Sequence, residues 1–272
     1  MTTHAPGTGE PDCTTIGDGD VRLDLDAARG GRVAQITAHG VELLIGSEAS
    51  DGDPLRWGSY PMVPWAGRVR HGRFEFGGAV HRLPTGADGH AMHGVGFLSR
   101  WTVGACSPTG AEFTLRLPND GSWPFGGLAR QTFDVTGDVV TLTIEVSAGE
   151  LAMPAMVGWH PWFRKPSVVE FAPTAMYRRH EGVAVAELVD VPPGPWDDCF
   201  VNTAPIVAVI DGVTVALSSD CTDWVVYDER PEATCIEPQS APPDAFNIGG
   251  HVLGPHETLR RWYRMRFDPP AR

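Results

Sequence analysis

The chain has 272 residues and a formal net charge of −13, with 34 acidic against 21 basic residues. This balance argues against nucleic acid or an anionic membrane as partner, because both favour a basic protein surface. A hydrophobic content of 42% describes an ordinary globular protein that is long enough to bury a large core. Lys165 is the only lysine, so a Schiff-base mechanism has one candidate nucleophile, and its neighbour Pro166 offers no activating group.

The cysteines and the apolar runs bear on the compartment of the protein. The five cysteines, at positions 13, 106, 199, 221 and 235, include no C-x-x-C pair and are odd in number, so they indicate neither a disulfide framework nor a zinc site. Residues 1–15 lack the basic and apolar stretches of a secretory signal peptide, and no apolar run reaches the length of a membrane span. We therefore expect a cytoplasmic protein.

In chain order, a polar arm comes first and a series of short strands follows. Residues 1–16 are predicted to form a flexible N-terminal arm, because Gly, Pro, Thr and Asp dominate them. Residues 17–272 are predicted to form a single domain, since no linker divides them. Alternation of apolar and polar residues predicts strands at 33–38, 41–45, 112–117, 129–135, 139–146, 206–210, 213–217 and 259–267.

The alternation and the turn signals together indicate the fold class. In the run 139–146, Leu142, Ile144 and Val146 fall on one face, as in a half-buried antiparallel strand. The dipeptide at 211–212, Asp-Gly, suits the type I′ turn of a hairpin. No stretch of a dozen residues has helical periodicity, and 32 glycines and 24 prolines fit many turns. The sequence therefore predicts an all-β fold, either a sandwich or a barrel.

Polar side chains gather in blocks at loops and strand ends. Residues 61–72 frame Arg68 and Arg70 with prolines and glycines, and residues 90–94 carry His90 and His93. An arginine offers a planar set of donors to sugar hydroxyls, although a surface arginine in a turn is the alternative. The two histidines lack an evident third ligand, which argues against a metal site. Residues 194–200 contain two acids beside a tryptophan, a pattern that fits sugar hydroxyls or a solvated turn.

Two further blocks place an ionisable side chain before a proline. In residues 157–164, His160 lies between two tryptophans, and in residues 235–247 the proline follows Glu237. Proline disfavours helix at the preceding residue, so both side chains are expected at strand ends or on stiff loops. A histidine can exchange a proton near neutrality, and the flanking rings are expected to lower its pKa by desolvation. The alternative for His160 is a structural histidine in a Trp-rich core.

The blocks 61–72, 90–94, 157–164 and 235–247, in this order, resemble those of the aldose 1-epimerase (galactose mutarotase) family. The resemblance implies a large antiparallel β-sandwich of the galactose mutarotase-like supersandwich type, with a sugar in a cleft on one face. It also implies an isomerase, or mutarotase, that interconverts the α and β anomers of a hexose by acid/base-catalysed ring opening and closure. That chemistry uses no cofactor and no metal.

Carried over motif by motif, the resemblance assigns two catalytic residues. His160 lies in a stretch similar to the family's Gly-x-His-Pro-Tyr-Phe motif, which makes it the general acid. Glu237 matches the glutamate of the Glu-Pro motif, which makes it the general base. Ring opening needs such a pair, because the anomeric hydroxyl loses a proton while the ring oxygen gains one.

The resemblance also assigns three substrate-binding residues. Arg68 matches the arginine of an Asn-Arg pair, and His93 matches the histidine of a His-Gly motif and would lie near the ring oxygen. Asp197 matches an acid that precedes an aromatic residue by three positions, with Asp198 as the alternative. Three departures from the family pattern are Gly67 in place of Asn, Trp162 in place of Tyr, and Pro-His-Glu at 255–257 in place of Pro-Gly-Glu. None removes a catalytic group, and the first two bear on the choice of sugar.

Two other functions stay open at this point. One is an epimerase of an anionic sugar such as a hexose 6-phosphate, for which Arg70, Arg73 and Arg164 would supply charge. The other is a non-catalytic carbohydrate-binding protein on the same fold, which would need neither His160 nor Glu237. The expected partner is a small-molecule sugar, without nucleic acid or membrane, and the chain is expected to be a monomer or a homodimer.

Overall fold

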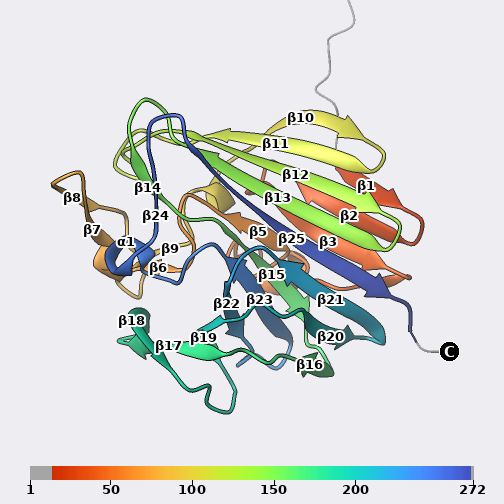
Figure 1. Ribbon diagram of the computed structural model, residues 1–272. Helices are drawn as coiled ribbons and strands as arrows, with labels where there is room; N and C mark the ends of the chain where they lie inside the picture. Colours follow the sequence, from red (N-terminus) through yellow and green to blue (C-terminus); the bar gives the residue numbers. More distant parts are fainter. Residues whose placement is uncertain (1–13, 271–272) are drawn as a thin grey trace, which may run out of the picture.

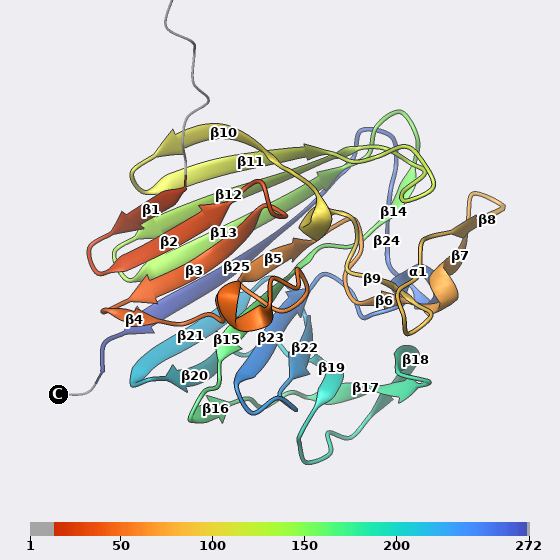
Figure 2. The same ribbon diagram turned by 180° about the vertical axis from the view of Figure 1, so that it is seen from behind.

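A computed structural model describes residues 14–270, and nearly all of its regular structure is strand. Two large antiparallel sheets lie one behind the other: Figure 1 looks onto the smaller sheet and Figure 2 onto the larger. Side chains from both sheets form one continuous hydrophobic core. The all-β sandwich predicted from the alternation is therefore confirmed.

The larger sheet has eleven strands in the spatial order β1-β2-β3-β5-β15-β23-β22-β19-β17-β18, with β4 paired to β3. These strands are β1 (Thr15–Asp18), β2 (Val21–Asp26), β3 (Arg32–Ala38), β4 (Val41–Glu42), β5 (Ser59–Met62), β15 (Gly158–Arg164), β23 (Ala233–Gln239), β22 (Asp223–Tyr227), β19 (Asp197–Val201), β17 (Ala175–His180) and β18 (Val183–Val189).

The smaller sheet has eight strands, and three short ladders stand apart from both sheets. The eight are, in spatial order, β10 (Thr102–Ser107), β11 (Gly110–Arg116), β12 (Leu128–Thr136), β13 (Val139–Ser147), β25 (Thr258–Asp268), β21 (Val213–Ser219), β20 (Ile206–Ile210) and β16 (Val168–Glu170). The short ladders are β6 (Arg68–Val69) with β9 (Ala91–Met92), β7 (Arg73–Phe76) with β8 (Ala79–Arg82), and β14 (Met153–Ala155) with β24 (His251–Leu253). The helical turns are η1 (Glu48–Ser50), η2 (Arg70–Gly72), η3 (Gly96–Leu98) and α1 (Ala245–Ile248).

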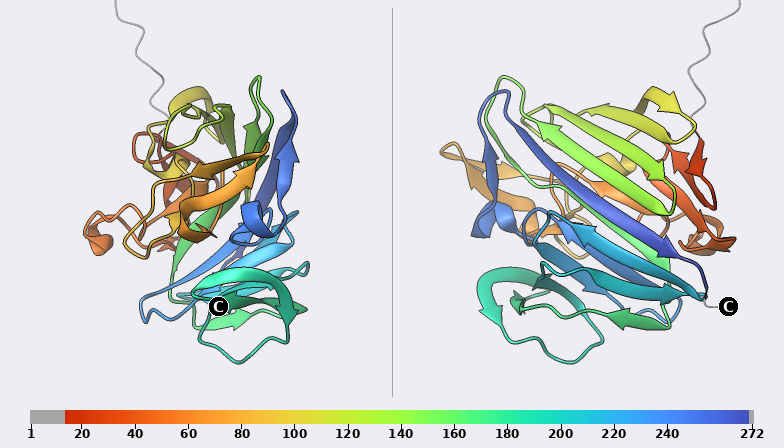
Figure 3. Two further views of the ribbon diagram at one scale, coloured as in Figure 1. Left: turned by 90° about the vertical axis from the view of Figure 1, so that its left-hand side faces the viewer. Right: turned by 45° about the vertical axis from the view of Figure 1, so that its right-hand side comes forward.

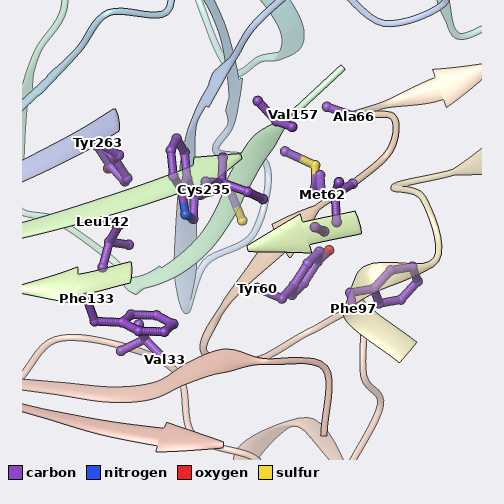
Figure 4. Close-up of a cluster of buried hydrophobic side chains, with 14 of the residues drawn as sticks. Val33, Tyr60, Met62, Ala66, Phe97, Phe133, Leu142, Val157, Cys235 and Tyr263 are labelled. Atoms are coloured by element: carbon purple, nitrogen blue, oxygen red, sulfur yellow. The ribbon is translucent and has the colours of Figure 1, made fainter. Parts of the chain in front are cut away.

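The core between the sheets follows from the period of two along each strand. In β13, Leu142, Ile144 and Val146 are buried as predicted, because alternate side chains of a strand point to the same face. Figure 4 shows Leu142 and Phe133 of the smaller sheet near Val33 of the larger. The predicted hairpin is present as β20 and β21, joined by a two-residue loop whose φ angles of +46° and +88° are those of a type I′ turn.

Two boundaries differ from the prediction. The first strand begins at Thr15, inside the predicted arm of residues 1–16, because Ile16 is buried and pairs with β2; residues 1–13 of that arm lie outside the described residues. The strand predicted at 41–45 ends at Glu42. Beyond it, the Gln35 side chain bonds the backbone N–H and C=O of Leu44, which replaces the ladder there.

The cysteines are only in part as expected. Cys199, Cys221 and Cys235 are free and buried, whereas Cys106 is disulfide-bonded. The odd number and scattered spacing of the cysteines therefore did not exclude a single disulfide. Within residues 14–270, no helix is long and apolar enough to cross a membrane.

The short ladder β6–β9 and the strands β17–β19 lie at the same end of the larger sheet, with the ladder above β17 and β18 in Figures 1 and 2. Figure 3 shows β17 and β18 at the bottom of the molecule, below the orange segment that carries β6 and β9. The paired strands β15 and β23 lie in the middle of the larger sheet, between β5 and β22. This arrangement places loops and strand faces from distant parts of the sequence around one region of the sheet.

Candidate active site

Strand pairing brings His160 and Glu237 together across 77 positions of sequence. In the antiparallel pair of β15 and β23, Gly158 lies opposite Gln239 and Trp162 opposite Cys235. His160 and Glu237 are each two residues inward from the first of these pairs, so the register sets them directly opposite on one face. Their side chains meet there, with 3.3 Å between Nε2 of the histidine and Oε1 of the glutamate.

Both residues lie inside strands, which corrects the expectation of strand ends or loops. His160 is the third residue of the seven in β15, and Glu237 is the fifth of the seven in β23. The ladder between the two strands is interrupted beside them, because Pro161 and Pro238 have no N–H to donate. The prolines therefore mark a gap within the ladder rather than its end.

Aromatic rings enclose His160 on both faces. Tyr60 of β5 stacks on one side at 4.7 Å between centroids, and Trp162 on the other side at 5.4 Å. The sequence suggested that both flanking tryptophans line the histidine, but Trp159 is the adjacent residue of a strand and points to the opposite face, against Tyr263. Tyr60 takes that place because β5 pairs with β15 and sets it opposite His160.

A cavity of about 270 Å³ opens above this face of the sheet. All five site residues predicted from the sequence line it, and so does Asp198. They come from five separate parts of the chain: β6, the turn after β9, β15, the start of β19, and β23. The structure therefore brings every one of these residues to a single cavity, whereas Arg70, Arg73 and Arg164 do not line it.

Gly67, Arg68 and His93 form one side of the cavity. Arg68 pairs with Met92 in the β6–β9 ladder, and the His93 backbone N–H donates to the Gly67 carbonyl at 3.0 Å. Arg68 Nε donates to Asp88 Oδ2 at 2.9 Å, which directs the guanidinium. Gly67 has φ +64°, and a Cβ there would lie 2.8 Å from Pro243 Cβ. A glycine at this departure from the family pattern thus relieves both backbone strain and a close contact.

The two neighbouring aspartates differ in what they face. Asp197 lies opposite Tyr227 in the β19–β22 ladder, and its Oδ2 accepts from Arg179 Nη1 at 2.9 Å. Asp198 Oδ1 is 3.4 Å from Arg179 Nε. Burial raises the pKa of Glu237, and the charge of Asp197 adds to this effect. Both aspartates line the cavity.

Comparison with known proteins identifies the family and the fold. The sequence profile of the family described as aldose 1-epimerase matches residues 14–266, nearly the whole chain. The chain belongs to the aldose 1-epimerase family. Its galactose mutarotase-like sandwich, expected from the four sequence blocks, is confirmed by a galactose mutarotase-like protein from Clostridium acetobutylicum. That structure superposes with a TM-score of 0.80 at 16% identity, over 92% of this chain and 93% of the other.

Two uncharacterized proteins of Escherichia coli K12 are related in sequence. YihR is 24% identical over 87% of this chain and 88% of its own length. YphB is 28% identical, but the match spans 55% of this chain and only about half, 51%, of YphB. The similarity to these two uncharacterized proteins assigns no reaction to this chain.

Burial governs the protonation of His160 and Glu237. It raises the pKa of Glu237 well above the ordinary value, and Asp197 adds to this effect. It lowers the pKa of His160 well below the ordinary value, and His93 adds to that effect. Because the two side chains are in contact, the arrangement favours one proton on the pair, with the carboxyl protonated and the imidazole neutral while no ligand is bound.

The His93 imidazole is neutral. Burial, with the Arg68 charge adding to it, lowers the pKa of His93 to about 3. Its Nδ1 is buried without a hydrogen-bond partner, and its ring stands edge-on to His160 at 5.0 Å. His90 does not share this position: its Nδ1 accepts from the His71 backbone N–H, and it does not line the cavity. The two histidines thus do not converge on one site.

Several residues of the cavity were missed from the sequence. Gln239 donates from Nε2 to Glu237 Oε2 at 3.3 Å, and its own Oε1 is buried without a partner. Its position two residues after Glu237 in a strand was a usable signal for the same face. Tyr60 and Arg179 gave no such signal, because only strand pairing and the β17–β19 contact bring them to the cavity.

Proposed function

We propose that this aldose 1-epimerase family member is a mutarotase that interconverts the α and β anomers of a hexose by acid/base catalysis. The observation that carries the proposal is the contact of 3.3 Å between His160 Nε2 and Glu237 Oε1 at the cavity wall. The anomeric hydroxyl and the ring oxygen are both bonded to C1, so an acid and a base that serve them have to lie close together. The cavity of about 270 Å³ suits a monosaccharide rather than a longer glycan.

In the proposed reaction, the single proton of the pair first passes from Glu237 to His160 when the sugar binds. In ring opening, the ionised Glu237 then accepts the proton of the anomeric hydroxyl, and the protonated His160 donates its proton to the ring oxygen. The C1–O5 bond breaks, and C1 becomes an aldehyde carbon. Rotation about the C1–C2 bond presents the other carbonyl face. Closure then reverses the two proton transfers, with Glu237 returning its proton to the carbonyl oxygen and His160 taking one from the C5 hydroxyl. Each transfer contributes roughly 10²–10⁴-fold to the rate.

The remaining side chains position the sugar. Arg68, already directed by Asp88, presents a planar guanidinium to hydroxyl oxygens. His93 offers an unpartnered Nδ1 near His160, and its neutral ring adds no charge beside the ring oxygen. Asp197 accepts hydrogen bonds from hydroxyls near Glu237. All three line the same cavity as the catalytic pair.

An anionic sugar is the second candidate substrate, but the arginines that could bind it differ from those suggested by the sequence. The three arginines first considered bind acids elsewhere: Arg70 contacts Asp244 and Glu181, Arg73 contacts Glu75, and Arg164 contacts Glu42. Within the described residues, four other arginines line the cavity, at positions 56, 68, 179 and 230. Acidic residues 197, 198, 229 and 237 line it as well, which favours a neutral hexose.

Polarimetry on freshly dissolved anomers tests the proposal. Protein added to a panel of pure α or β hexoses should speed the approach to the equilibrium rotation for at least one sugar. A parallel series with the corresponding 6-phosphates separates the neutral from the anionic substrate. If the sugars bind in calorimetry but no anomer of either series equilibrates faster than in buffer, the protein is a carbohydrate-binding protein and the catalytic proposal is wrong.

A further inference from the structure

Cys235 places a thiol beside the His160–Glu237 pair. It precedes Glu237 by two residues in β23 and therefore lies on the same face of the strand. One ligand atom from each of the three residues, a ring nitrogen of His160, Sγ of Cys235 and a carboxylate oxygen of Glu237, lies within 4.8 Å of the other two. All three side chains are buried. In the described part of the chain this is the one group of His, Cys, Asp and Glu with metal-ligand spacing.

The geometry fits a tetrahedral zinc ion with little movement. Zinc bonds of about 2.0–2.1 Å to nitrogen and 2.0–2.2 Å to oxygen set the two ligand atoms about 3.4 Å apart in a tetrahedron. His160 Nε2 and Glu237 Oε1 already stand 3.3 Å apart. A zinc–sulfur bond of about 2.3 Å sets the sulfur roughly 3.6 Å from the other ligands, so a shift of about 1 Å completes the set.

Charge and access also fit a zinc ion. One thiolate and one carboxylate balance the two positive charges, and a neutral imidazole completes the protein ligands, so no net charge is buried. His160 and Glu237 both line the cavity, so a cation and a water that completes its coordination can reach these two ligands from there. A sulfur and an imidazole ligand favour zinc over magnesium or calcium, which take oxygen ligands.

We propose that His160, Cys235 and Glu237 form an inhibitory site for a thiophilic divalent cation such as Zn²⁺. The bound cation occupies the nitrogen and oxygen that exchange protons with the sugar, so it blocks ring opening. The inhibitory effect rests on the proposed mutarotase function, whereas cation binding stands on the ligand geometry alone. The metal is not a cofactor here, because the acid/base chemistry runs without it.

Cobalt spectroscopy tests binding without any assay of activity. Co²⁺ added to metal-free, reduced protein should give a thiolate-to-cobalt charge-transfer band that saturates at one equivalent of Co²⁺. Added Zn²⁺ should displace the cobalt and remove the band. Cys235→Ala should abolish the band and weaken Zn²⁺ binding at least tenfold in competition with a chromophoric chelator. Cys199→Ala is the matched control, because Cys199 is also a buried free thiol and lines the same cavity but lies outside the group.

If Cys235→Ala does not fold, Glu237→Gln serves instead, because it removes one ligand with nearly unchanged shape and should also weaken Zn²⁺ binding at least tenfold. A band of full intensity in folded Cys235→Ala protein overturns the site, as does wild-type protein that binds no cobalt.

Mutarotation measured with added Zn²⁺ tests the inhibitory role. Zinc should inhibit the wild type and Cys199→Ala alike, EDTA should restore the rate, and Mg²⁺ should have no effect. Cys235→Ala should stay active and need at least tenfold more zinc for half inhibition. If Zn²⁺ displaces Co²⁺ from the site but does not slow mutarotation, the inhibitory role is wrong. A wild type that is inactive even without metal contradicts the proposed function, and the cobalt result then decides the binding site by itself.

Discussion

Glu237→Gln is the substitution that separates catalysis from binding and folding most cleanly. Glutamine keeps the shape of the side chain and its contacts with His160 and Gln239, but it cannot accept a proton from the anomeric hydroxyl. Loss of a general base costs roughly 10²–10⁴ in rate. At 1.36 kcal/mol for each factor of ten, the activation free energy should rise by about 3–5 kcal/mol. The sugar affinity should change little, because Arg68, His93 and Asp197 remain in place.

The same substitution should not destabilise the fold. Burial raises the pKa of Glu237, so its charged form is disfavoured in the native protein, and a neutral amide removes that cost. The melting temperature should therefore be equal to that of the wild type or higher. Glu229→Gln is the matched control: the same chemical change at an exposed residue of the cavity rim should leave kcat near the wild-type value.

The assay is the initial rate of optical rotation after an anomer is dissolved, corrected for the spontaneous reaction, with sugar affinity measured separately by calorimetry. A loss of at least a hundredfold in kcat with sugar affinity within threefold is the expected result. Folded Glu237→Gln protein with near wild-type kcat would refute the assignment of the base. Equal losses in kcat and in affinity would show instead that Glu237 mainly holds the sugar.

The remaining predictions concern pH, recognition and stability. Because burial lowers the pKa of His160 and raises that of Glu237, the pair should keep one proton over a wide pH range. On lowering the pH, kcat should fall only well below pH 6.5, and on raising the pH it should fall only well above pH 4.5. A narrow bell-shaped pH profile of kcat between these two values would contradict the shared proton. Asp197→Asn removes a charged acceptor worth about 1.5–3 kcal/mol, so kcat/KM should fall roughly ten- to hundredfold with part of the effect in KM, and a larger loss in Asp198→Asn would move the assignment by one residue. Gly67→Ala should lower the free energy of unfolding by more than the roughly 1–2 kcal/mol that a left-handed alanine costs, because the new Cβ meets Pro243. Gly77→Ala is the control, since Gly77 has φ +60° and open space around it. Equal losses of stability for the two variants in chemical denaturation would rule out the Pro243 contact.

The strands predicted correctly are those with one face in the core. In β13 and β20 the alternation is visible in the sequence because one face is more exposed than the other. The central strands gave no such pattern. Six of seven residues in β15 and all seven in β23 are buried, since the core covers one face and the cavity wall the other. Their prolines suggested that His160 and Glu237 lie at strand ends, and this prediction was wrong.

The site residues were reached by a different route. Family motifs pointed to Arg68, His93, His160, Asp197 and Glu237, and the structure sets all five around one cavity. Residue chemistry alone could not pair His160 with Glu237, because the register of two strands that are far apart in sequence is a property of the folded sheet. For the same reason, the sequence could not show which arginines line the cavity. The three that were considered for binding an anionic group, Arg70, Arg73 and Arg164, lie outside it.

The two X-Pro steps nevertheless carry information about the site. Pro161 and Pro238 fix the backbone φ immediately after His160 and Glu237, and they remove two donors from the ladder between β15 and β23. The neighbouring pairs, Gly158 with Gln239 and Trp162 with Cys235, still hold the strands in register on both sides of the gap. The proposed acid and base thus lie on a short, stiff segment at the centre of the larger sheet, with paired residues at both of its ends. Such a segment keeps their reacting atoms close without relying on a mobile loop, as proton transfer to two oxygens on one carbon requires.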